Sequence, residues 1–193
     1  MKICVFGAAS NEIDSSYIDA VETLGELMAK RGHSLVFGAG GNGLMGAAAR
    51  GVARGGGKVC GVIPKFFKEE NVERIYDKCD ELIFTENMAE RKATMEDRAD
   101  AFIIVPGGIG TFEEFFQVLT LKQLGRHVKP IAIYDVGGYY VKLQEFLGVS
   151  FEERFIRNDC RLLYGYSDTP EGVLEYIEND KQIKRDVHDL KNG

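Results

Sequence analysis

Two charged segments flank a glycine-rich turn and are the first candidates for chemistry. Arg91 and Lys92 are adjacent within the segment 87–99, and Glu114 follows the turn PGGIGT at 106–111. Taken alone, neighbouring cations on a charged helix indicate a solvated face. Beside a phosphorylated sugar they would supply charge, Arg through its planar fork and Lys as a point charge. A carboxylate there could stabilise a cationic sugar or activate water.

Glu114 also has a purely structural interpretation. Thr111 and Glu114 have the spacing of a capping box, in which Thr111 is the N-cap of a helix and Glu114 bonds back to it. On spacing alone, capping is the safer interpretation. Glu113 has the less defined place of the two glutamates and is expected to point outward. The catalytic interpretation of Glu114 therefore depends on the turn beside it.

Three turns rich in glycine or small residues follow apolar runs: GAAS at 7–10, GAGGNGLMG at 38–46 and PGGIGT at 106–111. Glycine lets the backbone approach an anion, and helix N-termini point N–H groups at it. Any α/β protein needs tight turns, but three of them favour a phosphate ligand. The second turn contains GxGxxG, yet a dinucleotide site expects an acidic residue about 20 positions on. Pro64 and Lys65 stand there instead, and no GxxxxGK[ST] motif occurs.

Alternating strands and helices are expected to position these turns. Apolar runs predict strands at 2–6, 34–37, 59–63, 81–84, 101–105, 131–134 and 162–166. Helices are predicted at 16–31, 44–54, 87–99, 111–124, around 139–147 and from Pro170, whereas 65–80 has no clear pattern. Continuous apolar strands, each followed by a helix, predict a Rossmann-like doubly wound α/β fold with a parallel sheet covered on both faces. Ligands bind such sheets at the carboxyl ends of the strands.

Composition restricts the possible partners. The 193 residues carry a net charge of -6, which argues against nucleic acid as the main partner. They are expected to form one domain, 1–193, with a tail that frays after about residue 180. No apolar run approaches the ~20 residues of a membrane span, and the amino terminus does not read as a signal peptide, so a cytoplasmic location is expected. The four cysteines form no CxxC pair, and no metal or organic cofactor is expected.

Together, the motifs resemble the LONELY GUY (LOG) family of cytokinin-activating phosphoribohydrolases, whose members are often labelled lysine decarboxylases. The resemblance covers nearly the whole chain and includes CVFGAAS, GAGGNGLMG, GVIP, ERK, ADAFIIVPGGIGTFEE, QVLTLKQLG and GGYY. Its most specific part is an Arg-Lys pair about 15 residues ahead of PGGxGTxxE. The resemblance implies cleavage of adenosine-type nucleoside 5′-monophosphates, such as AMP, to the free base and ribose 5-phosphate. It also implies a homodimer or larger assembly with the pocket near the subunit interface.

The resemblance assigns catalysis to Arg91 and Glu114, with Arg91 expected at a cleft rather than in the core. Its nucleotide-contacting positions are Ser10, Gly41, Gly43, Lys92, Gly107, Gly108, Ile109, Gly110, Thr111, Phe112, Glu113 and Thr120. Two departures stand out. Ala89 replaces the His of MHxRK in plant-like members and removes any base-recognition role of that His, and GAAS replaces the common GSS, which removes one hydroxyl.

The main alternative is a non-catalytic nucleotide-binding or carrier protein of the same fold. Retention of both Arg91 and Glu114 favours the enzyme. A single-stranded DNA-binding relative is disfavoured by the acidic charge and the lack of a basic and aromatic surface. A true lysine decarboxylase would need a pyridoxal-phosphate Schiff-base lysine and its partners, for which the sequence gives no signal.

Overall fold

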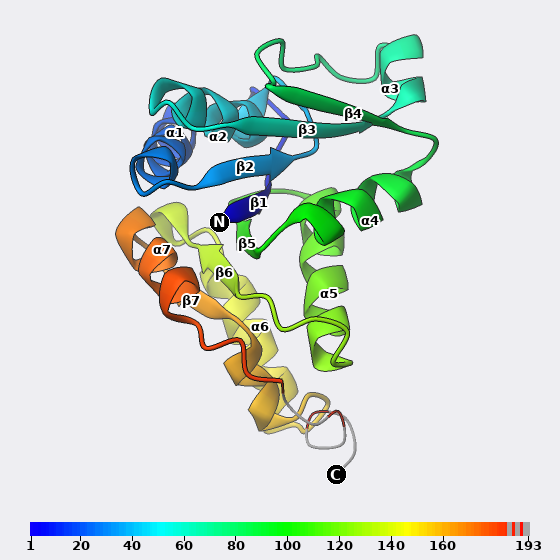
Figure 1. The fold of residues 1–193 in the computed structure, drawn as a ribbon. Helices are drawn as coiled ribbons and strands as arrows, with labels where there is room; N and C mark the ends of the chain where they lie inside the picture. The colour runs from blue at the N-terminus through cyan, green and yellow to red at the C-terminus, as the bar shows by residue number, and fades with distance from the viewer. Residues whose placement is uncertain (185–186, 188–189, 191–193) are drawn as a thin grey trace.

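A parallel sheet organises the chain (Figure 1). The computed structural model describes residues 1–184, 187 and 190, and within them seven strands lie in the order β4-β3-β2-β1-β5-β6-β7. The order reverses between β1 and β5, which is the point where doubly wound sheets bind ligands. The strands are β1 (Lys2–Phe6), β2 (Ser34–Phe37), β3 (Val59–Pro64), β4 (Glu81–Thr85), β5 (Ala101–Ile104), β6 (Ile131–Tyr134) and β7 (Gly165–Ser167).

Both faces of the sheet are buried, which explains the continuous apolar runs. In β1, Ile3 and Val5 pack into the core on one face, whereas Cys4 and Phe6 pack into the core on the other. Helices α1 (Ser15–Lys30), α2 (Gly43–Arg54) and α7 (Pro170–Asn179) cover the first face. Helices α4 (Met88–Arg98) and α5 (Ile109–Gln123), with the start of α6 (Val141–Glu152), cover the second.

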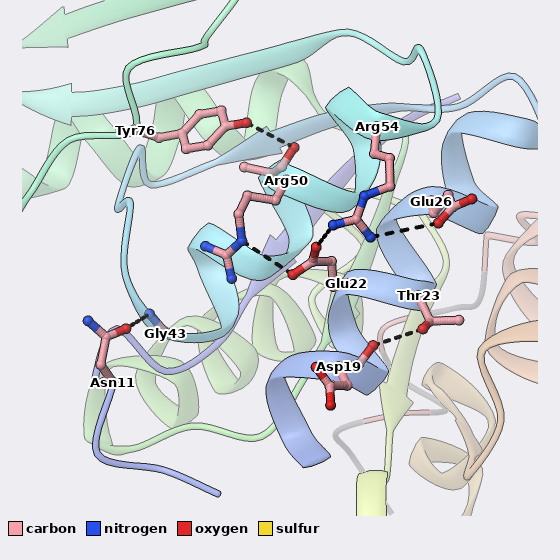
Figure 2. A network of polar contacts seen from close by, with 10 residues as sticks. Asn11, Asp19, Glu22, Thr23, Glu26, Gly43, Arg50, Arg54 and Tyr76 are labelled. Carbon is pink, nitrogen blue, oxygen red and sulfur yellow. Dashed lines mark hydrogen bonds and ion pairs between the residues drawn. The ribbon is translucent and has the colours of Figure 1, made fainter. Parts of the chain in front are cut away.

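Helices α1 and α2 pack closely beside the sheet (Figure 2). A Cβ added at Gly51 would lie 2.1 Å from the Glu22 carbonyl oxygen, so only glycine permits this approach. Across the contact, the Glu22 carboxylate accepts from Arg50 Nε at 3.2 Å and from Arg54. The close packing and the ion pairs fix α2 as a rigid support for the turn that precedes it.

The predicted Rossmann-like fold is confirmed, and most strands and helices lie within two residues of their predicted bounds. The last strand is a correction: its predicted range 162–166 is wrong, because 162 and 163 end the 3-10 helix η2 (Asn158–Leu163) and β7 begins at Gly165. The apolar side chain of Leu163 is buried in a small core between α6 and η2, so the signal came from helix packing and not from a strand.

The sequence did not define the structure of two further segments. The uninterpreted stretch 65–80 contains the short helix α3 (Lys65–Glu69) and an extended segment in which Ile75 forms an antiparallel bridge to Gly40. Of the tail that was expected to fray, residues 185–186, 188–189 and 191–193 lie outside the described residues, and Leu190 is buried beside α6. In the described part of the chain, no helix is long and apolar enough to cross a membrane.

Candidate active site

Helix α5 begins earlier than the capping-box pattern predicts. Its N-cap is Gly108 and its first residue is Ile109, with no side-chain cap. Thr111 lies inside the first turn, where it is only 3% exposed. Its hydroxyl packs over Gly107, since a Cβ added there would lie 2.1 Å from Thr111 Oγ1. The capping-box interpretation is therefore wrong, because a glycine too small to collide with Thr111 allows the helix to start before it.

The start of α5 offers backbone N–H groups to a ligand. The N–H groups of Ile109, Gly110 and Thr111 have no carbonyl partner within the helix, because they belong to its first turn. A Cβ added at Gly108 or Gly110 would meet no atom within 4 Å, and neither glycine has a positive φ. The protein itself therefore does not require glycine at these two positions. Free N–H groups and the helix dipole favour an anion here.

Arg91 comes from α4 and is buried at the carboxyl ends of two strands. Its Nε donates to the Val62 carbonyl at 3.2 Å and its Nη2 to the Gly38 carbonyl at 2.8 Å. The ring of Phe67 covers the guanidinium at 5.4 Å. With 6% exposure, Arg91 is not on a solvated face. Strand carbonyls anchor it, and its position at a cleft stays a prediction.

One edge of the Arg91 guanidinium remains available. Nη1 contacts only the thioether sulfur of Met88 at 3.8 Å, and sulfur is a weak acceptor. Two arms of the fork thus hold Arg91 in place, while the third can donate to a substrate. Truncating Arg91 would leave two carbonyls without donors, so the variant would lose stability as well as activity.

Glu114 lies on α5 one turn after its start and is partly buried. Burial raises the pKa of its carboxyl to about 7, and the positive charge of Arg91 opposes that shift. Among the described residues, no hydrogen bond satisfies the carboxylate. A carboxylate with a pKa near neutrality and no protein partner is suited to move a proton or to face a developing positive charge.

The neighbouring acid behaves differently. Glu113 is exposed, as expected, and its carboxylate accepts from Lys92 Nζ at 2.5 Å. This pair spans α4 and α5 beside the start of α5. It joins the two helices that carry the arginine and the glutamate, and it keeps a cation close to the free N–H groups.

Sequence reasoning missed Glu73, which precedes β4. Its Oε1 is buried without a hydrogen-bond partner, and a Cβ added at Gly40 would lie 2.1 Å from it. Burial raises the pKa of this carboxyl, and Arg91 opposes the shift. No signal in the charged stretch 65–80 distinguished Glu73, because only the bridge between Ile75 and Gly40 brings it to the site.

The second glycine turn serves the protein itself. The Gly43 N–H donates to Asn11 Oδ1 at 2.8 Å (Figure 2). The Leu44 N–H donates to the Ala8 carbonyl at 2.8 Å. The Gly41 N–H donates to the Arg74 carbonyl at 2.7 Å. At these positions the protein itself binds the N–H groups, so they are not free for an anion. Substrate contact at Gly41 and Gly43 stays a prediction.

The remaining predicted substrate contacts do not all lie beside Arg91 and Glu114. Ser10 is exposed on the first turn, and Ile109 is exposed at the mouth of the site. Phe112 points back to the ring of Tyr140. Thr120 lies farther along α5, in a groove of about 1130 Å³ that α5 shares with η2 and the end of α6. The structure thus brings the α5 start, Arg91, Lys92 and Glu114 together and leaves Thr120 apart.

Fold and site together define a class of protein: a doubly wound α/β protein with a helix start that no side chain caps, an Arg-Lys pair and a glutamate at the switch point of its sheet. In the described part of the chain, no group of three or more His, Cys, Asp or Glu side chains could hold a metal ion.

Comparison with known proteins identifies the family. A family model described as possible lysine decarboxylase matches residues 45–177. Cytokinin riboside 5′-monophosphate phosphoribohydrolase LOG from Oryza sativa subsp. japonica is 41% identical over 177 residues, covering 92% of this chain and 72% of that protein. The enzyme LOG4 of the same description from Arabidopsis thaliana is 39% identical, covering 92% and 81%. The chain belongs to the LOG family.

Solved structures support the same fold. A molybdenum cofactor binding protein from Rippkaea orientalis has a TM-score of 0.69 and 19% identity, covering 92% of this chain and 95% of that one. The molybdenum cofactor carrier protein from Chlamydomonas reinhardtii has a TM-score of 0.67 and 20% identity, covering 92% and 97%. At these identities, the likeness concerns the fold alone.

Proposed function

We propose that this protein hydrolyses the N-glycosidic bond of adenosine-type nucleoside 5′-monophosphates, including AMP and cytokinin riboside 5′-monophosphates, and releases the free base and ribose 5-phosphate. The observation that carries the proposal is the position of Glu114. A partly buried carboxylate without a protein partner stands one turn from a helix start whose N–H groups are free. Membership of the family that includes the phosphoribohydrolases supports the same reaction.

In this proposal the α5 start binds the phosphate and fixes the sugar beside Glu114. Cleavage of the bond between the sugar and the base gives the sugar oxocarbenium character. The ionised Glu114 stabilises that charge and takes a proton from the attacking water, whose oxygen bonds to the sugar carbon. The electron pair of the broken bond leaves with the base, and Arg91 offsets that charge through its available Nη1. The proton taken by Glu114 then passes through solvent to the base, which leaves neutral and returns Glu114 to its ionised form. The reaction needs no metal or organic cofactor.

Glu73 gives the sugar a further partner in this proposal. Its buried oxygen has no donor in the part of the chain that the structure describes, and a buried acceptor without a donor is costly. A ribose hydroxyl is a donor of suitable size. Ser10, Lys92 and the segment 107–113 complete the proposed nucleotide contacts.

The test compares AMP, N6-prenyl-AMP and adenosine, without added metal, with chromatography for free base. AMP should release adenine, and adenosine should react far more slowly, because the phosphate supplies binding energy that is used at the reacting carbon. Equal rates on AMP and adenosine would contradict phosphate anchoring. Absence of base release from every nucleotide would contradict the enzyme. The ratio of the rates of base release from AMP and from N6-prenyl-AMP measures the base preference of a site in which Ala89 replaces the histidine of plant-like members.

We also propose that the active unit is a homodimer or larger. Large apolar side chains that line the groove containing Thr120 are exposed, with Phe155 87% exposed and Phe116 38% exposed. Burying them against a second copy would remove apolar surface from water, and Thr120 would then lie at a subunit interface. Light scattering that detected a fully active monomer would contradict this proposal.

A carrier remains the alternative function, since solved molybdenum cofactor proteins share the fold. The two functions predict different results in the same assay. A carrier would bind the nucleotide and return it intact, whereas the enzyme releases base in proportion to time and to protein concentration.

A further inference from the structure

The end of β5 and the loop after it are held by their carbonyl groups. The Val105 carbonyl accepts from the Tyr140 hydroxyl at 2.8 Å, the Pro106 carbonyl from the Ala8 N–H at 3.0 Å, and the Gly107 carbonyl from the Tyr139 hydroxyl at 2.7 Å. The third bond lies next to the free N–H groups of α5. It joins the proposed phosphate subsite to a tyrosine that follows β6.

The bond to Gly107 orients a peptide. Because a peptide is planar and trans, the carbonyl of one residue and the N–H of the next point in opposite directions. With the Gly107 carbonyl turned towards Tyr139, the Gly108 N–H is turned away from Tyr139. No protein acceptor among the described residues receives that N–H. Tyr139 therefore controls the direction of a donor at the start of α5.

The tyrosine follows a turn that is anchored by the buried residues Asp135 and Val136. The 3-10 turn η1 (Val136–Gly138) precedes it, and Gly137 and Gly138 have φ values of 63° and 75°. Asp135, which is 3% exposed, accepts from the Tyr140 N–H at 2.6 Å and from the Tyr166 hydroxyl. On its outer side, the Tyr139 ring meets Tyr17 edge to face at 6.1 Å.

We propose that Tyr139 is a positioning residue of the phosphate subsite: its hydroxyl holds the Gly107–Gly108 peptide so that the Gly108 N–H faces the phosphate of the nucleotide. The inference rests on the proposed function, because it assumes a phosphorylated sugar at the α5 start. Tyr139 itself needs no contact with the substrate. Without its hydroxyl, the peptide can rotate, and one donor is no longer fixed before the ligand arrives.

The variant Tyr139→Phe removes the hydroxyl and keeps the ring. Binding of ribose 5-phosphate, measured by calorimetry, should weaken about fivefold to tenfold, the usual effect of losing one hydrogen bond to a charged group. KM for AMP should rise by a similar factor, while kcat stays within about twofold. The melting temperature should change little, since the Tyr139 side chain is 42% exposed and water can reach the freed carbonyl.

The matched control is Tyr17→Phe, which removes the other hydroxyl of the aromatic pair. In the part of the chain that the structure describes, the Tyr17 hydroxyl makes no hydrogen bond. This variant should bind ribose 5-phosphate as the parent protein does.

Three results would overturn the inference. They are unchanged affinity in Tyr139→Phe, an equal loss in the control, and absence of ribose 5-phosphate binding by the parent protein. Failure of the proposed function gives a different result. In that case the parent protein binds ribose 5-phosphate but releases no base, and the calorimetric comparison still decides the role of Tyr139.

Discussion

The starts of α2 and α5 follow similar glycine-rich turns and have opposite uses. At α2, the Gly43 N–H is bound by Asn11 (Figure 2), and the Leu44 N–H is bound by the Ala8 carbonyl. At α5, the first N–H groups have no such partners among the residues that the structure describes, and the carbonyls before them are the bound groups. A glycine-rich turn before a helix therefore indicates an anion site only when its donors are free.

The glycines themselves differ in the same way. In the second turn they make room for the protein: a Cβ at Gly38 would lie 1.8 Å from Arg91 Nη2, and one at Gly43 would lie 2.4 Å from the Ala8 carbonyl oxygen. In the third turn, Gly108 and Gly110 face open space. The protein's own packing therefore requires glycine at Gly38 and Gly43 but not at Gly108 or Gly110, where a ligand is the proposed reason for glycine.

The largest effect is expected at the packed turn. Gly43→Ala places a methyl group against backbone at a residue with a φ of 56°. Strain and overpacking together should lower the free energy of unfolding by about 3 kcal/mol or more. Chemical denaturation measures this loss. A variant as stable as the parent would show that the second turn is not required for packing.

Glu114→Gln tests whether the chemistry belongs to α5. Removing the charge should lower kcat about a hundredfold or more, because glutamine cannot serve as a base. Stability at neutral pH should not fall, because Glu114 is not a cap. Glu113→Gln is the control and should keep most of the activity, since its partner is Lys92. Retained activity in Glu114→Gln, with a lower melting temperature, would restore the capping interpretation.

The pH dependence of stability follows from the same residue. Burial raises the pKa of Glu114 from an ordinary value of 4.5 to about 7. Between these two pH values the folded protein holds a proton that the unfolded chain releases. Protonated Glu114 therefore contributes to the free energy of unfolding, and this contribution is complete below pH 4.5 and lost as the pH rises through 7. The contribution amounts to up to about 3 kcal/mol. Glu114→Gln should flatten this part of the profile, and activity of the parent should rise through the same pH range as the base ionises.

A smaller effect is expected at the open turn. Gly110→Ala adds a methyl group where the protein has space, so the free energy of unfolding should stay constant or rise by about 0.5–1 kcal/mol, as alanine favours a helix. KM for AMP should rise about tenfold if the methyl group obstructs the phosphate, the cost of one lost charged contact. An unchanged KM together with unchanged stability would show that no ligand approaches this glycine.

The smallest effect is expected at Asn11, whose side chain accepts the hydrogen bond from the first N–H group of α2. Asn11→Ala removes the acceptor of the Gly43 N–H, which should cost about 1 kcal/mol of stability, as for other lost helix caps. KM for AMP should not change. A rise in KM without a loss of stability would place the nucleotide at α2 and reverse the comparison.

Sequence reasoning captured the fold because its signals are local. The continuous apolar run of β1, which is buried on both faces, spans only a few residues. The same is true of Thr169, which caps α7, and of Pro170, which begins it. It failed where distant segments meet. Neither the burial of Arg91 under strand carbonyls nor the place of Glu73 beside Gly40 has a local pattern. The helix start at Ile109 was missed because a capping pattern cannot reveal that Thr111 packs on Gly107.

The anchoring of Arg91 also bears on how the chain folds. Its two hydrogen bonds reach carbonyls 29 and 53 residues away in the sequence, at the ends of β3 and β2. Such contacts form only after the intervening loops have closed, and loop closure carries an entropic cost that local helix formation avoids. During refolding, helical structure should therefore return before activity does. The arginine becomes competent only once the sheet has assembled around it.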